Sequence, residues 1–178
     1  METVRDLILT AGKKWRVFAS GETPTAGEMA DGLSAFQDLV NGLCVGWTDV
    51  DKTAAYEAKE DERVKTTGAV ATVTLPDLVD DYGGQRRPRS GAKVLAIGSD
   101  GTRLSMYRGD KGAWITASDL TLEADIPLDS QIHNLAADAL AGRYCSLFGE
   151  PTQTQYRASQ RALGLLSLAT RPTSRETY

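Results

Sequence analysis

The chain has 178 residues, of which 41% are hydrophobic and 25% are charged, and its net charge is -4 with a pI near 5.1. This length suffices for one domain, or for one domain with an inserted lobe, and the composition is typical of a soluble globular protein. The acidic balance argues against a general nucleic-acid binder, and no apolar run has the length of a membrane span or the form of a signal peptide, so a reducing cytoplasm is the expected compartment.

The region from 25 to 47 predicts the helix around which the fold is organised. Its large apolar residues recur every three or four positions and therefore share one helical face; they are Met29, Leu33, Phe36, Val40, Leu43 and Trp47. Thr25 and Glu28 have the spacing of a capping box at the start of this helix. Four glycines within it each cost roughly 1 kcal/mol relative to alanine, so the helix depends on what packs against it.

A shorter helix from 3 to 14 precedes this one, with Thr3 as its cap and Asp6 in its first turn. The charged stretch 52–65 fits either a helical extension or a solvated connector, and the sequence leaves both open. Apolar runs bounded by turn residues then predict strands at 66–75, 93–97, 102–108, 113–117 and 121–126. Asp100-Gly101 is a strong hairpin signal, and residues 80–91 are expected to form an exposed loop. The centre of the chain is therefore expected to be a small antiparallel sheet.

Two more helices are predicted after Asp129, which is a candidate cap together with Ser130. The first has an alanine-rich apolar face, which comprises Ile132, Leu135, Ala136, Ala139, Leu140, Tyr144 and Leu147. Gly149 and Pro151 separate it from a last helix at about 152–169. The inward residues of that helix are expected to be Tyr156, Ser159, Leu163 and Leu166, with Arg157 and Arg161 one turn apart beside them.

This order of elements predicts an α+β fold, namely an antiparallel four-helix bundle with a small antiparallel β-sheet lobe inserted between helices 2 and 3. The expected domains are one discontinuous helical bundle of residues 1–50 and 128–170 and an inserted β lobe of residues 64–126. Residues 171–178 are too polar to join a core and are expected to be a flexible C-terminal tail.

The sequence offers little for catalysis, and we expect no cofactor, no metal site and no enzymatic activity. His133 is the only histidine, so a histidine-rich metal site cannot be assembled and any Ser–His–Asp triad would have to use this residue. On its alanine-rich helix, a non-catalytic histidine is the favoured interpretation. Cys44 and Cys145 lie in helical apolar patterns without metal-ligand spacing and are expected to be core residues. No glycine-rich phosphate loop is present.

Acidic residues at 57–62 and 77–81 leave one enzymatic alternative. A carboxylate pair such as Glu60 and Asp77 could serve a small hydrolase acting on the bacterial cell wall. Acidic clusters this dense, without an enclosing aromatic or apolar wall, are usually solvated, so a solvated face is the favoured interpretation. The tripeptide Arg108-Gly109-Asp110 is similar to an adhesion motif, but a hairpin turn accounts for its glycine and aspartate.

Basic and polar residues at three places are candidates for contacts with other molecules. Arg86, Arg87 and Arg89 could bind DNA phosphate or an acidic neighbour, although a solubilising loop is the favoured interpretation. In the tail, the anchors for a partner would be Arg171, Pro172, Arg175 and Tyr178. The last helix adds Arg157 and Arg161, beside its inward residues.

Two segments carry a resemblance to a known family. The first is ASGETPTAGEMADGLSAFQDLVNGLCVGW, residues 19–47, which follows a short helix and ends in a helix closing on tryptophan. The matching positions in it are Ala35, Asp38, Leu39, Asn41, Leu43 and Trp47. The second is IPLDSQIHNLAADALAGRYCSLFGEPTQTQYRASQRALGLL, residues 126–166. With the first helix they cover about half of the chain and resemble the head-to-tail adaptor proteins of tailed bacteriophages, including the packaged-DNA stabilisation proteins (tail accessory factors) of short-tailed phages.

The resemblance implies a structural virion protein that joins the portal vertex of the phage head to the tail. Such adaptors form a dodecameric ring on the portal that extends the DNA channel after packaging, and we expect this chain to be monomeric when free. The implied partners are the portal protein, a further tail, nozzle or tail-completion protein, and other copies of the chain, with no membrane contact. Double-stranded DNA would pass through the channel without sequence-specific contact.

The resemblance also implies which residues bind these partners. In this family the C-terminal segments reach onto the portal, so the tail anchors together with Arg157 and Arg161 are the candidates for the portal or subunit interface. Arg86, Arg87 and Arg89 are the candidates for contacts with DNA or a neighbouring subunit. The expected location is the head–tail interface of the virion, after assembly in the host cytoplasm.

Overall fold

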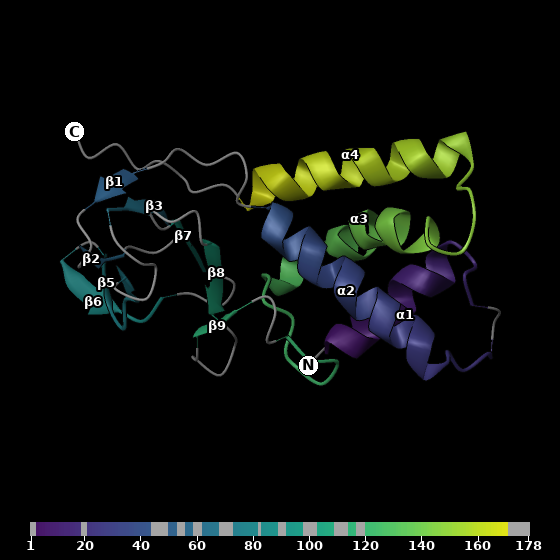
Figure 1. Ribbon diagram of the computed structural model, residues 1–178, viewed down its shortest axis with the longest axis horizontal. Coiled ribbons are helices and arrows are strands. Elements are labelled where there is room, and N and C mark those ends of the chain that lie inside the picture. Colours follow the sequence, from purple (N-terminus) through teal and green to yellow (C-terminus); the bar gives the residue numbers. More distant parts are fainter. Residues whose placement is uncertain are drawn as a thin grey trace.

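The computed structural model describes residues 3–18, 21–43, 50–52, 56–58, 62–67, 73–81, 83–88, 92–97, 103–108, 114–116 and 120–170. Over these residues the molecule has a helical part and a β part that lie side by side (Figure 1). The helices are α1 (Val4–Lys14), α2 (Ala26–Gly42), α3 (His133–Cys145), which follows the 3-10 turn η3 (Ser130–Ile132), and α4 (Gln153–Ala169). The strands are β1 (Val50–Lys52), β2 (Tyr56–Glu57), β3 (Glu62–Thr66), β4 (Val73–Thr74), β5 (Val79–Asp81), β6 (Gly84–Arg86), β7 (Lys93–Ile97), β8 (Arg103–Arg108) and β9 (Trp114–Thr116).

Local sequence signals fix where α1, α2 and α4 begin. Thr3, Thr25 and Thr152 are N-caps, and each forms a capping box with the residue three positions on, which is Asp6, Glu28 or Gln155 respectively. Asp129 caps η3, because its carboxylate accepts a hydrogen bond of 2.8 Å from the Gln131 N–H. The predicted starts of the first two helices are confirmed, since these boxes satisfy amides that would otherwise lack partners.

The apolar face of α2 is buried as predicted, but the helix is shorter than expected. Met29, Phe36, Val40 and Leu43 are buried, and Leu33 is partly buried. The helix ends at Gly42, where the Leu43 N–H donates to the Val40 carbonyl at 3.2 Å. The remainder of the predicted helix, with Cys44 and Trp47, lies outside the described residues.

Helix α3 is the one against which the other three pack. It contacts α1, α2 and α4, and its buried residues are mostly alanine, namely Ala136, Ala137, Ala139 and Ala141, with Leu140 and Tyr144. Figure 1 shows α4 lying along α3 and α2 crossing in front of α1. The ring of Tyr144 is fully buried against Phe18, with centroids 5.7 Å apart, and its hydroxyl donates to the Glu28 carbonyl at 2.7 Å. The small alanine side chains of α3 let the neighbouring helices approach it closely. The apolar face of α2 covers one side of α3.

The predicted fold class, an antiparallel four-helix bundle with an antiparallel β lobe, is wrong. The five-stranded sheet has the order β1-β3-β7-β8-β9, and the pairs β1–β3 and β3–β7 are parallel. The short pair β2–β4 is parallel too. Only β7–β8, β8–β9 and β5–β6 are antiparallel in the described part of the chain. The prediction rested on hairpin signals, which indicate pairing only between strands that are adjacent in the sequence. A parallel pair joins strands through a crossover connection, and no short sequence pattern indicates such a pair.

The strand predictions had mixed outcomes. The strand at 93–97 is β7, and β8 and β9 fall within the predicted 102–108 and 113–117. The stretch 52–65 is neither a helix nor a plain connector, because it holds β2 and most of β3. Residues 80–91 were predicted to be an exposed loop, but they hold the end of β5, the whole of β6 and the turn between these strands, where Gly83 has φ +88°.

Residues 120–128 belong to the helical core rather than to an edge strand. The Val4 and Arg5 N–H groups at the start of α1 donate to the Ala124 and Leu122 carbonyls at 3.0 and 2.9 Å. Leu120, Ile126 and Leu128 are buried in the helical core. The predicted strand at 121–126 is therefore wrong, because this segment supplies acceptors to unpaired amides of a helix end instead of joining the sheet.

Candidate interaction surface

Helix α4 exposes a face that is partly basic and partly apolar. Ser159, Ala162 and Leu166 are buried on the side that contacts α3. The opposite side, which we call the α4 outer face, consists of Arg157, Arg161, Gly164, Leu165 and Leu168. Their spacing of three and four places them along one line of the helix. All five are exposed, and Leu165 and Leu168 keep 46% and 59% of their surfaces accessible.

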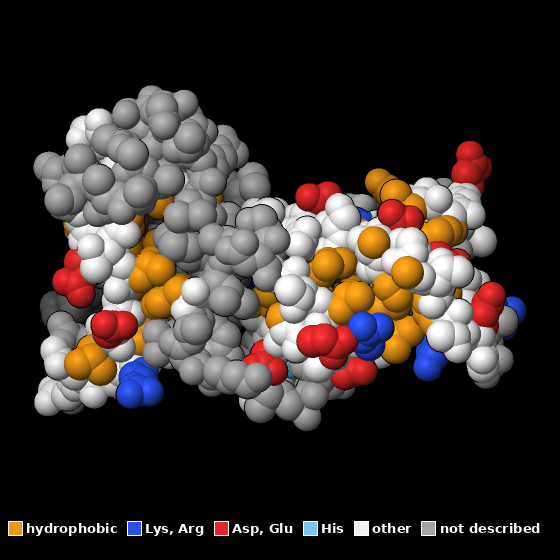
Figure 2. All heavy atoms as spheres, turned by 60° about the horizontal axis from the view of Figure 1, so that its bottom comes forward, with side chains coloured by type: hydrophobic (Ala, Val, Ile, Leu, Met, Phe, Trp, Pro, Cys, Tyr) orange, Lys and Arg blue, Asp and Glu red, His pale blue; other side chains and the backbone are white. Residues whose placement is uncertain are grey.

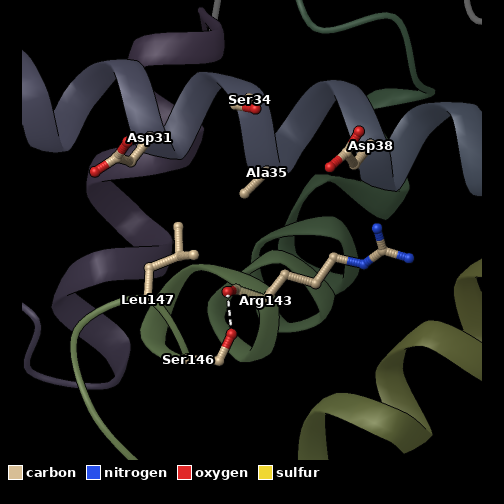
Figure 3. Close-up of a pocket in the computed structure, with 7 residues that line it drawn as sticks. All are labelled: Asp31, Ser34, Ala35, Asp38, Arg143, Ser146 and Leu147. Carbon is tan, nitrogen blue, oxygen red and sulfur yellow. Dashed lines mark hydrogen bonds between the residues drawn. The ribbon is translucent and has the colours of Figure 1, made fainter.

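The second feature is a hollow of about 340 Å³ between α2 and the end of α3, here called the α2–α3 hollow. It is lined by Asp31, Ser34, Ala35, Asp38, Arg143, Ser146 and Leu147. Figure 3 shows Asp31, Ala35 and Asp38 on α2 along one side of the opening, and Arg143 and Leu147 on the other side. The two aspartates are seven residues apart, which is two helical turns or about 10 Å along α2.

The shape of the α2–α3 hollow follows from where α3 ends. The Ser146 hydroxyl donates to the Arg143 carbonyl at 2.6 Å, and the helix ends at Cys145. Leu147 therefore lies beyond the last helical turn and is 58% exposed, so its predicted place on the buried face is wrong. Its side chain instead gives the hollow an apolar edge.

Arg143 is directed toward the end of α2. Its Nη2 atom lies 3.5 Å from the position that a Cβ atom on Gly42, the last residue of α2, would occupy. A guanidinium there is favourable because the carboxyl end of a helix carries partial negative charge. Asp31 and Asp38 are both exposed. The carboxylates outnumber the guanidinium, so the hollow is acidic on balance.

The structure separates the sequence-predicted contact residues into two groups. Arg157 and Arg161 lie on the α4 outer face, whereas Arg86 and Arg87 lie at the end of the β5–β6 hairpin. Arg86 is half-buried and its Nη1 atom donates to the Arg87 carbonyl at 3.1 Å, while Arg87 is exposed. Arg89 and the tail anchors Arg171, Pro172, Arg175 and Tyr178 lie outside the described residues.

Sequence reasoning missed Leu165 and Leu168 and placed Tyr156 on the wrong side of α4. Tyr156 is 56% exposed, because the contact with α3 is centred on the small residues Ser159 and Ala162. The signal that could have found the leucines is their spacing of four and seven from Arg161. On the face shown in Figure 2, hydrophobic side chains also gather over the helical part, with acidic and basic side chains beside them.

Three side chains that could take part in a reaction, those of His133, Cys145 and Tyr56, are at least partly buried. His133 is half-buried with Nε2 3.1 Å from the Leu128 carbonyl oxygen. Cys145 is buried, and burial raises the pKa of its thiol to about 11. The Tyr56 hydroxyl donates to Glu62 at 3.2 Å, and burial followed by the nearby Glu62 charge raises the pKa of Tyr56.

The carboxylates of the hydrolase alternative do not form a described site. Asp77 and Glu57 are exposed, and Glu60 lies outside the described residues. Within the ranges given above, no group of three or more His, Cys, Asp or Glu side chains is arranged to hold a metal ion. Among the same residues, no helix has the length and apolar character needed to span a membrane.

Comparison with known proteins adds no relative. Neither the scan against protein-family models nor the search of curated proteins found a match to this sequence.

Proposed function

We propose that this chain is a structural adaptor that joins the portal vertex of a phage head to the tail and forms a ring around the DNA channel. The observation that carries the proposal is the location of the two resembling segments. Residues 19–47 contribute α2 and residues 126–166 contribute α3 and most of α4, and these helices share one hydrophobic core. The part of the sequence that resembles the adaptor family is thus also a coherent structural unit.

The distribution of polar and exposed groups agrees with this role. An adaptor binds through surfaces and chain ends, and the α4 outer face and the α2–α3 hollow are surfaces of that kind. Helix α4 leads directly into the polar residues 171–178. In the proposal, Arg171, Pro172, Arg175 and Tyr178 bind the portal protein, and Arg157 and Arg161 bind a neighbouring copy.

The remaining partners follow from the same role. Arg86, Arg87 and Arg89 would contact DNA phosphate or a neighbouring subunit, and the side of the ring away from the portal would bind a tail, nozzle or tail-completion protein. A net charge of -4 suits a channel through which DNA slides, because like charge disfavours sticking. The protein would be located at the head–tail interface of the virion.

The test is binding to the purified portal protein encoded in the same genome. Deleting residues 171–178 is expected to leave the far-UV circular dichroism and melting temperature unchanged, because these residues are polar and the helical core among the described residues is formed by residues 4–166. Portal binding, measured by co-sedimentation, is expected to be lost. A chain whose last eight residues are replaced by glycine and serine controls for length. Portal binding by the truncated chain at full affinity would refute the role of the tail, and failure of the full chain to bind would refute the adaptor function.

A further inference from the structure

We propose that the α4 outer face of one copy docks into the α2–α3 hollow of the next copy, in a head-to-tail contact. This inference takes its setting from the proposed ring, and it specifies which two surfaces of the chain meet. The juxtaposition that carries it is a basic and apolar helix face and an acidic, apolar-edged hollow on the same molecule.

The charges of the two surfaces are complementary. The outer face presents two exposed guanidinium groups, from Arg157 and Arg161, and α4 contains no acidic residue. The hollow presents the exposed carboxylates of Asp31 and Asp38, and Arg143, which also lines it and extends toward the end of α2, offsets one of these two charges. The arginines are one turn apart and the aspartates two, a difference of about 5 Å along the axes that long arginine side chains can span. Complementary charge of this kind favours the correct partner and register.

The apolar groups of the two surfaces match as well. Leu165 and Leu168 are about half exposed on the outer face, and Leu147 is 58% exposed at the edge of the hollow. Bringing them together would remove apolar surface from water at the centre of the contact, with the ion pairs at its rim. Gly164 lies between the arginines and the leucines, and nothing lies within 4 Å of the position its Cβ would occupy. It therefore leaves room for close approach by another helix.

The contact has to be made between copies. The side of α4 opposite the outer face is packed on α3, so the outer face points away from the hollow of its own chain. Two different surfaces of one chain that bind each other produce a heterologous contact, which closes into a ring when the rotation between copies allows it. We expect the contact to be weak. A weak contact suffices for a ring, because copies bound side by side on a portal would have a high effective concentration, of order millimolar.

The experiment measures association of the purified full-length chain by sedimentation velocity from about 1 μM to about 1 mM. The wild type is expected to associate beyond the dimer as the concentration rises. The face variant Arg157→Glu/Arg161→Glu and the hollow variant Asp31→Lys/Asp38→Lys are each expected to raise the dissociation constant at least about tenfold, because like charges then meet. All four residues are exposed, so both variants are expected to keep the wild-type circular dichroism spectrum and melting temperature.

A mixture of the two variants is the decisive sample. In the mixture, the glutamates on the outer face of the first variant can meet the lysines in the hollow of the second variant, so association is expected to return to the wild-type range. The matched control Lys13→Glu/Asp77→Lys reverses one charge of each sign at exposed positions outside both surfaces and is expected to associate like the wild type.

Four outcomes would overturn the inference: a wild type that stays monomeric throughout, association that stops at the dimer, variants that associate like the wild type, or a mixture that fails to recover. Each of these leaves the portal-binding result of the full chain unaffected. Loss of the self-contact is therefore distinguishable from loss of the proposed adaptor function.

Discussion

Two glycines, which lower the stability of an isolated helix, lie where two helices of this fold approach each other closely. A Cβ atom on Gly142 of α3 would overlap the Oγ and Cβ atoms of Ser159 on α4, whose hydroxyl donates to the Ala139 carbonyl at 3.3 Å. A Cβ atom on Gly32 of α2 would lie 2.5 Å from Cγ2 of Ile8 on α1. The glycine that costs helix propensity therefore permits the packing that stabilises the helix.

Gly142→Ala is expected to destabilise the protein although alanine favours helix. Overpacking of this kind costs about 1–3 kcal/mol, and the propensity gain of up to about 1 kcal/mol offsets part of it. Gly164→Ala is the matched control, because open space surrounds that position, and it is expected to stabilise by about 0.5–1 kcal/mol. Urea unfolding monitored by circular dichroism measures both. Equal effects of the two substitutions would show that α3 and α4 are not in close contact at Ser159.

At the scale of elements, the three capping boxes differ in one chemical respect. Those of α1 and α2 use the carboxylates of Asp6 and Glu28, whereas that of α4 uses the amide of Gln155. Hydrogen bonds from the Thr25 backbone and hydroxyl, at 2.7 and 2.8 Å, lower the pKa of Glu28, and those from Thr3 lower the pKa of Asp6. A carboxyl group whose pKa is lowered by folding contributes stability above its unfolded pKa and loses it as the pH falls through the folded value.

The start of α2 is therefore expected to weaken in acid and the start of α4 to be unaffected. Glu28→Gln is expected to be less stable than the wild type at pH 7, with the difference shrinking as the pH falls below about 4.5, the ordinary pKa of this group. Gln155→Glu provides the converse test, since it is expected to stabilise the protein at pH 7 and to lose that advantage in acid. Denaturant midpoints at pH 7, 5, 4 and 3 give the comparison, and a constant difference between Glu28→Gln and the wild type would contradict it.

Local elements of this fold were predictable from sequence, and their long-range arrangement was not. The starts of α1 and α2 depend on residues three positions apart, and β7 on a run of five buried residues, so short windows contain the relevant information. The parallel pairing of β1, β3 and β7 depends on contacts across long connections. At the candidate surface, Arg157 and Arg161 were predicted only to lie beside the inward residues of the last helix. The exposure of Leu147 depends on where α3 ends, and that of Leu165 and Leu168 on which side of α4 meets α3.

On the scale of the whole molecule, the described part of the chain has two separate main hydrophobic clusters of unequal size. The larger unites α1, α2, α3 and α4 with residues 120–128. The smaller comprises Ala58, Val64, Val73, Val94 and Ala96, with Tyr56, Leu75 and Trp114 packed against it. Separate cooperative units of a protein can open independently of each other. The β part is therefore expected to open without disturbing the helical part.

Hydrogen exchange measured by mass spectrometry tests this difference. Because α3 packs against the three other helices, its peptides are expected to exchange at least about tenfold more slowly than peptides from β3 and β7. Val94→Ala, at a fully buried position of the smaller cluster, is expected to accelerate exchange in the β strands and leave α3 unchanged. Leu140→Ala, equally buried in the larger cluster, is expected to accelerate exchange in the helices. If Val94→Ala accelerated α3 as much as β7, the two parts would open as one unit.

The contacts of α1 also have a consequence for how the chain is made. Lys14 pairs with Asp138 at 2.6 Å, and the two residues are 124 positions apart; Arg5 pairs with Glu123 at the same distance, 118 positions on. At about 5–20 residues per second, the ribosome needs roughly 6–25 s to add that stretch. Throughout that interval the apolar side of α1, formed by Val4, Leu7, Ile8 and Ala11, has no access to α3. Helix α1 is thus synthesised well before α3, against which it packs. During that interval we expect α1 to be a target for chaperones that bind amphipathic helices.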